Sequence, residues 1–167
     1  MVDEELVDAS ALVGFPGAPF PAPAVAAAAD SVRVDAGWHI APVVTQTVEI
    51  DTDRSRVALL PSLRVIEVVA VTNVDTGEEI TGWRLSKHRG TLTLKGGRWP
   101  EQIEVEFKHG YESCPPALFP VIAERVQRGR AGLAVQESLG SRSVSYRQQY
   151  DPVSAGILGR FTIPGRP

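Results

Sequence analysis

The 167-residue sequence predicts an α+β fold, in which two main helices pack with an antiparallel β meander inserted between them and extended arms occupy both ends. Three observations predict it. Apolar residues recur at helical spacing on either side of the middle of the chain, alternate with polar residues through the middle, and are divided there by turns containing glycine. Hydrophobic residues make up 43% of the sequence, which is enough to bury a core.

The first helix is expected at residues 21–36. Residues 1–20, which are acidic and then rich in Gly, Pro and Ala, should form an extended arm before it. Pro21 and Pro23 suit the first turn of a helix, where a missing N–H costs nothing. Gly37 is well placed to end the helix in a left-handed conformation. This helix opens a body that should extend over residues 21–132.

The middle of the body, residues 43–108, is expected to form about five to seven strands, because the apolar period there changes to two. The clearest strand covers 103–108, where Ile, Val and Phe alternate with Glu, Glu and Lys. Such alternation is typical of a strand with one dry face and one wet face. Turns at 75–77, 88–90 and 96–97 divide the region.

A second helix is expected at 116–130, where apolar residues again share one face. Pro120 would disturb a helix interior, so the helix should either kink there or begin near Phe119. Gly129 and Gly132 are expected to end it. The remaining residues, 133–167, lack the pattern of a core and are interpreted as a C-terminal docking tail.

Charge is unevenly distributed around the net value of −3. From Glu124 to the end there are seven arginines and three acidic residues, a balance of +4, which leaves a balance of −7 for the rest. A basic tail on an acidic body indicates that the tail meets an acidic surface; a solvated basic terminus explains the same pattern.

Membrane and secretory classes are not favoured. No apolar run approaches the ~20 residues that span a bilayer, and no apolar segment follows the acidic start as it would in a signal peptide. The single Cys114 cannot form an internal disulfide, which fits synthesis in a reducing cytosol.

No motif predicts catalysis, a cofactor or a metal site. Asp75-Thr76-Gly77 spells the aspartic-protease triplet, but that chemistry needs two carboxylates that share a proton, and a hairpin turn explains the triplet here. His39, His88 and His109 lack metal-ligand spacing and are interpreted as structural hydrogen-bonding residues. Cys114 precedes two prolines, which leave no helix amides to activate a thiolate. We therefore expect no enzymatic activity.

The three tryptophans, Trp38, Trp83 and Trp99, are expected in the core or at the junction of helix and sheet, because large aromatics dominate small cores. The alternative is a small β-rich binding module in which exposed tryptophans stack on a ligand.

In the tail, arginines are interleaved with aromatic and aliphatic residues. That composition suits a protein interface, because Arg and Tyr often anchor interfaces. It also suits nucleic acid, although the acidic remainder argues against DNA as the main ligand. The candidate partner-binding residues are Arg142, Tyr146, Arg147, Tyr150, Ile157, Leu158 and Phe161.

Several short segments carry a resemblance to a known family. In order, they are GWHIAP at 37–42, LLPSLRV at 59–65, TGWR at 81–84, GRWP at 97–100, HGYESCP at 109–115 and QESLGSRSVSY at 136–146. Together they strongly resemble the head-to-tail adaptor, or connector, proteins of long-tailed bacteriophages that infect actinobacteria. The resemblance covers residues 15–163, and the first and fifth segments are its most specific parts.

The resemblance implies a structural virion protein in the neck, made in the host bacterial cytoplasm. Such adaptors form a ring of identical subunits, typically twelve, below the portal protein. The inserted β-region faces the next connector ring toward the tail, and the C-terminal segment clasps the portal. DNA would pass through as cargo, along an acidic channel. A stopper or a tail terminator, which are other connector rings, is the alternative within this class.

Overall fold

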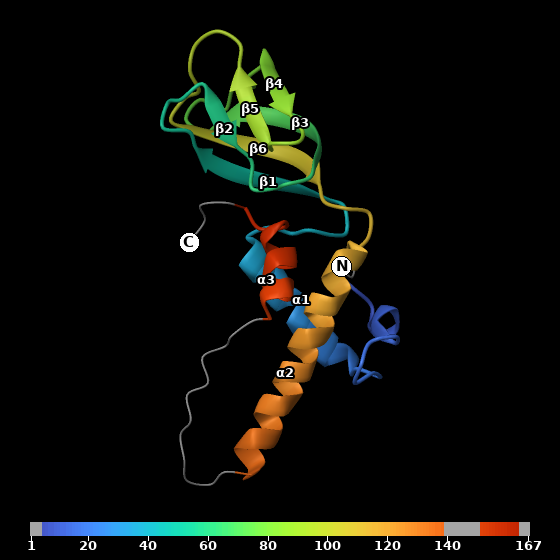
Figure 1. The fold of residues 1–167 in the computed structure, drawn as a ribbon. Helices are drawn as coiled ribbons and strands as arrows, with labels where there is room; N and C mark the ends of the chain where they lie inside the picture. The colour runs from blue at the N-terminus through green and yellow to red at the C-terminus, as the bar shows by residue number, and fades with distance from the viewer. Residues whose placement is uncertain (1–4, 139–150, 164–167) are drawn as a thin grey trace. The chain divides into compact units, whose positions relative to one another are not determined.

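The computed structural model describes residues 5–138 and 151–163. The chain divides into two compact units (Figure 1). We call Met1–Ala36 with Ser113–Thr162 the α unit, and Gly37–Glu112 with Ile163–Pro167 the β unit. Helices in one unit and antiparallel sheets in the other confirm the α+β class.

The α unit contains the helices α1 (Ala22–Ala36), α2 (Phe119–Ser138) and α3 (Pro152–Gly159), and the 3-10 helices η1 (Ala9–Leu12) and η2 (Pro116–Leu118). α1 lies against α2, and α3 contacts both (Figure 1). The buried face of α1 consists of Val25, Ala28, Ala29, Val32 and Ala36. Alanines at three of these positions permit a close approach of neighbouring backbone, as helical spacing in the sequence indicates.

α2 begins at Phe119, as one of the two predictions for Pro120 requires, because proline is tolerated in the first turn. The expected end at residue 130 is wrong, since the helix continues through Gly129 and Gly132 to Ser138. A glycine inside a helix costs only about 1 kcal/mol relative to alanine, so its neighbours can carry the helix past it.

The predicted extended arm at residues 1–20 is also not what the structure shows for residues 5–20. Leu6, Val7, Leu12 and Phe20 are buried. Ser10 donates its backbone N–H to the Asp8 carboxylate (2.7 Å) at the start of η1. Hydrogen bonding from the Ser10 side chain, and then from its backbone, lowers the pKa of Asp8. A segment without helical or strand periodicity can still bury individual side chains, and residues 5–20 bury these four.

Of the segment 133–167, interpreted as a docking tail, residues 133–138 and 151–163 are described. Residues 133–138 continue α2, and α3 lies against α1 and α2 with Ser154 buried. Residues 139–150 lie outside the described residues. Within the described ranges, no helix is long and apolar enough to cross a membrane.

The β unit has six strands: β1 (Val44–Asp51), β2 (Val57–Leu59), β3 (Val65–Asn73), β4 (Trp83–Ser86), β5 (Thr91–Leu94) and β6 (Gln102–His109). Their number agrees with the sequence, but their order is not that of a simple meander. They form two three-stranded antiparallel sheets, β1-β6-β3 and β2-β5-β4 (Figure 1). The last strand thus lies between the first and third, a long-range pairing that alternation along one strand does not specify.

The inner faces of both sheets enclose one hydrophobic core. Its buried residues are Ala58, Leu60, Val65, Val71, Leu92, Trp99, Ile103, Val105 and Phe107. β6 pairs with β1 in unbroken register, whereas its pairing with β3 is shifted twice, between Val65 and Glu67 and between Val68 and Ala70. β-bulges of this kind bend the strand that carries them.

Candidate functional site

Three of the segments that carry the resemblance meet in space, where the chain enters and leaves the β unit. The backbone N–H of Tyr111 donates to the carbonyl of Ile40 (2.8 Å), and that of Gly110 donates to the carbonyl of Arg64 (2.9 Å). The Nε2–H of His39 donates to the carbonyl of Pro42 (2.8 Å). Within the β unit, residues 39–42, Arg64 and residues 109–111 of these segments therefore form one junction, which we call the motif junction.

Glycine is required at position 110 of this junction. Its φ is +108°, a conformation that L side chains rarely adopt. A Cβ there would also lie 2.7 Å from the carbonyl oxygen of Pro42 and 3.2 Å from that of Ile40. The segment 109–115 thus needs its glycine because the backbone of the entering segment passes so close to it.

An aromatic cluster surrounds His109 at the junction. The ring of His109 is fully buried and lies 4.6 Å from the Phe107 ring and 5.9 Å from the His39 ring, centroid to centroid. Its Nε2–H donates to the side-chain oxygen of Gln46 (3.0 Å). Burial, and to a smaller extent the charge of His39, lower the pKa of His109 to about 4.

These contacts confirm the structural reading of His39 and His109, since both side chains make hydrogen bonds within the unit. His88 lies in an exposed turn. Among the described residues, no group of three or more His, Cys, Asp and Glu side chains could hold a metal ion.

The other residues singled out for chemistry also have structural surroundings. The turn predicted at 75–77 is confirmed: Asp75 is exposed, and Asn73 accepts the backbone N–H groups of Asp75 (3.0 Å) and Gly77 (2.8 Å). Cys114 is buried, and burial raises the pKa of its thiol to about 12, with Arg33 opposing the shift. A thiol so rarely ionised is a poor nucleophile.

The tryptophans form no exposed platform. Trp99 and Trp38 are buried, as predicted. Trp83 is half-buried against the core and donates its Nε1–H to the carbonyl of Ile80 (3.0 Å). Aromatic rings that stack on a ligand need an open face, and the two buried tryptophans lack one.

The candidate partner-binding residues fall into two groups. Arg142, Tyr146, Arg147 and Tyr150 lie outside the described residues. Ile157 and Leu158 of α3, and Phe161 just after it, are half-buried in the α unit. The Phe161 N–H donates to the carbonyl of Leu158 (2.8 Å) at the end of the helix. Their role as partner-binding residues stays a prediction.

Sequence reasoning missed a polar link between two helices. Arg125 of α2 pairs with Asp35 (2.6 Å) and donates to the hydroxyl of Ser31 (2.7 Å), both on α1. The arginine side chain is only 8% exposed. Residues 90 positions apart in sequence carry no local signal of this pairing.

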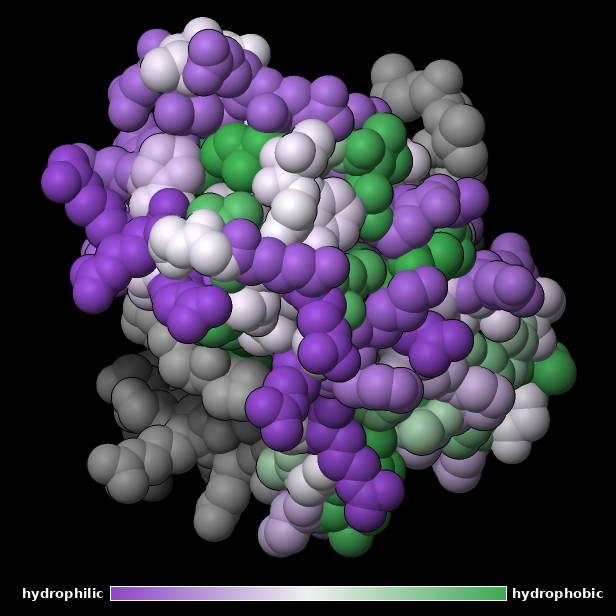
Figure 2. Space-filling model, turned by 90° about the horizontal axis from the view of Figure 1, so that it is seen from above, coloured by the Kyte–Doolittle hydropathy of each residue, from purple (hydrophilic) through white to green (hydrophobic). Residues whose placement is uncertain are grey.

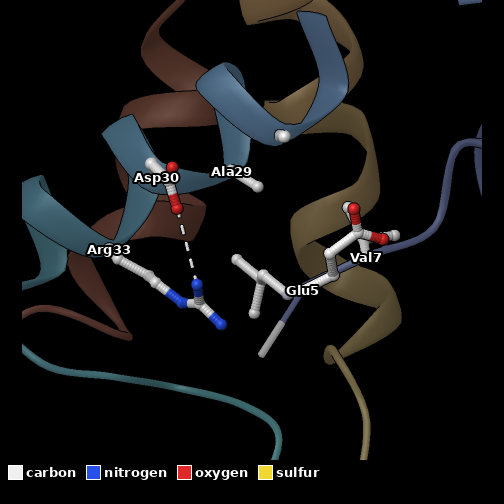
Figure 3. A pocket seen from close by; sticks show the side chains of 7 residues that line it. Glu5, Val7, Ala29, Asp30 and Arg33 are labelled. Atoms are coloured by element: carbon white, nitrogen blue, oxygen red, sulfur yellow. Dashed lines mark hydrogen bonds and ion pairs between the residues drawn. The ribbon is translucent and has the colours of Figure 1, made fainter. Parts of the chain in front are cut away.

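A hollow of about 250 Å³ lies between the N-terminal segment and α1. Asp30 and Arg33, which form an ion pair (3.5 Å), are on one side of it, and Glu5 and Val7 are on the other (Figure 3). The rest of the lining is aliphatic or small. This mixture favours no particular ligand chemistry.

Comparison with known proteins identifies a fold relative. No protein-family model matches the chain, and no curated protein matches it. A chain in a solved structure described as "Neck of empty GTA particle computed with C6 symmetry" does match, with a TM-score of 0.56 and 17% sequence identity. The alignment covers 87% of this chain and 80% of that chain. The likeness shows that the two chains share a fold.

Proposed function

We propose that this protein is a neck protein of a tailed phage or phage-like particle. More specifically, we propose that it is the head-to-tail adaptor, which forms a ring below the portal and joins the DNA-filled capsid to the tail. The observation that carries the proposal is the fold shared with a chain from the neck of a gene transfer agent (GTA) particle. Because 87% of the chain is covered, neither the α unit nor the β unit can lie outside the likeness.

The adaptor assignment, as distinct from the neck in general, rests on the sequence resemblance. The most specific segments of that resemblance, 37–42 and 109–115, contact each other at the motif junction. Two matching segments that are far apart in the sequence but in contact in the structure support the resemblance more strongly than either segment alone. Their contact supports a β-region inserted between two helices, which is the arrangement that the resemblance implies.

The proposed role is non-enzymatic. Three observations support it: the buried, un-ionised thiol of Cys114, the His109 ring held neutral by burial, and the exposed turn position of Asp75. Among the hydrogen bonds of the described residues, none joins these groups to the partner that a nucleophile or a general base requires. The portal, the next connector ring and further copies of this chain are the partners proposed, with DNA as passing cargo.

A stopper or a tail terminator is the second candidate, because a shared neck fold does not by itself distinguish the rings of a neck. The β-rich binding module with exposed tryptophans is not favoured, since Trp38 and Trp99 are buried.

The experiment that tests the proposal offers the purified protein separately to portal-bearing filled heads and to free tails, with electron microscopy as the readout. An adaptor adds a ring to the portal vertex of the heads and leaves tails unchanged. A terminator adds a ring to tails instead. Addition to neither particle would contradict the proposed function.

A paired variant tests the predicted clasp. Arg142→Glu with Arg147→Glu should weaken addition to heads, because these arginines are expected to pair with acidic groups of the portal. The control is Arg160→Glu, which reverses an arginine that is exposed just after α3. Equal behaviour of the two would show that 142 and 147 do not contact the portal.

A further inference from the structure

The β unit sorts its charges by sheet. Residues 81–100, which form β4, β5 and the connections around them, contain five basic residues and no Asp or Glu. These basic residues are Arg84, Lys87, Arg89, Lys95 and Arg98, and all five are exposed. Near β2, Arg56 is a further exposed basic residue, whereas Arg54 pairs with Glu101 and Arg64 lies at the motif junction. The strands β4 and β5 with their turns therefore carry basic residues and no acidic ones.

The register of this sheet shows what its outer face presents. Val57 pairs with Thr93, and Thr93 with Arg84, so these three residues form one row; Leu59, Thr91 and Ser86 form the next. Ala58 and Leu92, between the rows, are buried in the core. Val57 and Leu59 are 44% and 68% exposed. We call these two rows, with the flanking Lys87, Arg89 and Lys95, the basic face.

The basic face has the composition of a protein interface. Two exposed aliphatic side chains lie among threonines, with basic residues around them, as in interfaces that have an apolar centre and a charged rim. Hydrophilic side chains cover most of the surface visible in Figure 2, with hydrophobic groups exposed between them. Among the described residues, Arg84, Lys87, Arg89 and Lys95 form no ion pair.

The outer face of the other sheet, β1-β6-β3, is acidic. Its rows are Glu49–Glu104–Thr72, Thr47–Glu106–Ala70 and Thr45–Lys108–Glu67. We call these rows, with Asp51, the acidic face. Glu49 lies directly opposite Glu104, and like charges in that position destabilise a sheet. Within the described ranges, none of the carboxylates of these rows is in an ion pair. Folding alone gives no reason to place them together.

We infer that the basic face of one copy docks on the acidic face of the next copy. The inner faces of both sheets line one core, so the two outer faces point away from each other and cannot meet within one chain. They match in charge, and Val69, at the β-bulge beside the row of Ala70, is a 54% exposed apolar residue of the same sheet. The inference deepens the proposed function, since it names the surface by which copies would assemble.

This contact is heterologous, because two different surfaces of the same chain meet. Heterologous contacts build a ring when the rotation between copies closes, and an open filament when it does not. Duplex DNA is the competing ligand for the basic face. The net charge of −3 and the matching acidic face in the same unit favour a second copy instead.

The test uses two charge-reversed forms of the full chain. Glu49→Lys with Glu104→Lys leaves a chain with two basic faces, and Arg84→Glu with Lys87→Glu leaves one with two acidic faces. Each alone should associate with itself at least about tenfold more weakly than the wild type, because like charges now meet. An equimolar mixture of the two should associate again. Sedimentation velocity at low and high salt measures this, and salt should weaken association in the wild type and in the mixture.

Controls place a reversed charge elsewhere on the exposed surface. Glu112→Lys in the β unit and Arg160→Glu in the α unit should leave association unchanged. Tryptophan fluorescence checks the fold of the β unit in each variant, and circular dichroism at the helical signal checks the α unit. A wild-type chain that stays monomeric at low salt and high concentration would overturn the inference, as would a mixture that does not recover.

Two further outcomes separate the competing explanations. If Arg84→Glu with Lys87→Glu abolishes binding to a short DNA duplex while self-association is unchanged, the basic face is a nucleic-acid surface and the inference is wrong. If association follows the charge pattern but the protein adds to neither heads nor tails, the inference stands and the proposed function fails. If the protein adds to heads but association does not follow the charge pattern, the proposed function stands and the inference is wrong.

Discussion

The α unit and the β unit use their charges in opposite ways. In the α unit, the three arginines of α1 and α2 whose side chains are described all form ion pairs within the unit: Arg33 with Asp30, Arg125 with Asp35, and Arg128 with Glu124. In the β unit, residues 81–100 carry only basic charges, whereas the outer rows of β1-β6-β3 carry four glutamates and one lysine. Arg54–Glu101 is the ion pair found among the described residues of this unit.

The difference indicates what stabilises each unit. Helix packing in the α unit includes polar links between side chains, whereas the β unit relies on its apolar core and on close backbone contacts such as the motif junction. Its surface charges add little to its own stability and remain available to a partner. Four predictions test this comparison, from the largest expected effect to the smallest.

Gly110→Ala should destabilise the β unit by about 3 kcal/mol or more, because it combines an unfavourable φ with a contact of 2.7 Å to Pro42. The matched control is Gly82→Ala, which has φ +79° but no atom within 4 Å of the added Cβ, and should cost about 1 kcal/mol. Urea unfolding followed by tryptophan fluorescence measures both, since all three tryptophans lie in the β unit. Equal losses would show that the junction is not tightly packed.

Acid should weaken the β unit before it weakens the α unit. In the unfolded chain, His109 binds a proton near pH 6.5. In the folded chain its pKa is lowered to about 4, so the ring stays neutral until the pH falls to about that value. The unfolded state therefore holds more protons in this window, and the free energy of unfolding falls as pH falls, by about 3 kcal/mol in total.

Fluorescence-detected unfolding between pH 6.5 and 4 checks this dependence. His109→Gln should flatten the curve, while the exposed His88→Gln should keep it. All three histidines lie in the β unit, so helical circular dichroism should show a smaller loss for the α unit between pH 6.5 and 5. A curve for His109→Gln that matches the wild type would contradict the prediction.

Arg125→Met should destabilise the α unit by about 1–2 kcal/mol, because it removes the ion pair with Asp35 and the bond to Ser31. The expected loss of stability is smaller than for a fully buried ion pair because the Asp35 side chain is 40% exposed. Arg128→Met removes a more exposed pair, four residues apart on α2, and should cost only about 0.4 kcal/mol. Thermal melts followed by helical circular dichroism measure both losses. If neither substitution lowers the stability, ion pairs do not stabilise the α unit and the contrast with the β unit is wrong.

Glu104→Gln should stabilise the β unit by a few tenths of a kcal/mol, because it relieves the repulsion from Glu49 across the strand pair. Removing a charge is thus expected to help the β unit and to harm the α unit. The counterpart on α2 is Glu124→Gln, which loses its pair with Arg128 and should be slightly destabilising. The urea midpoints of the two variants measure these effects. If both midpoints shift in the same direction, the proposed contrast between the units is wrong.

Local pattern predicted the elements whose burial depends on one segment alone. The buried face of α1 and the alternation in β6 are both visible in sequence, since each follows from the geometry of a single helix or strand. The turn at 75–77 is likewise local. The buried tryptophans follow from the size and apolarity of their rings.

Features that depend on distant partners were not predictable in this way. The buried N-terminal segment, the position of β6 between β1 and β3, and the Arg125–Asp35 link all join residues far apart in the chain. The absence of acidic residues from 81–100 is visible in the sequence, but its meaning is not. Only the strand pairing shows that this stretch lies on one sheet and the carboxylates on the other.

The motif junction has a consequence for how this chain can change over evolution. The β unit is an insertion whose two ends, 37–42 and 109–112, are hydrogen-bonded to each other inside the unit. An insertion with adjoining ends can be exchanged as a cassette, because the residues before and after it need not move to accommodate a replacement. Related chains can therefore vary the sheets and their surface charge while retaining the helices, and the junction residues are the part of the β unit that such exchange must preserve.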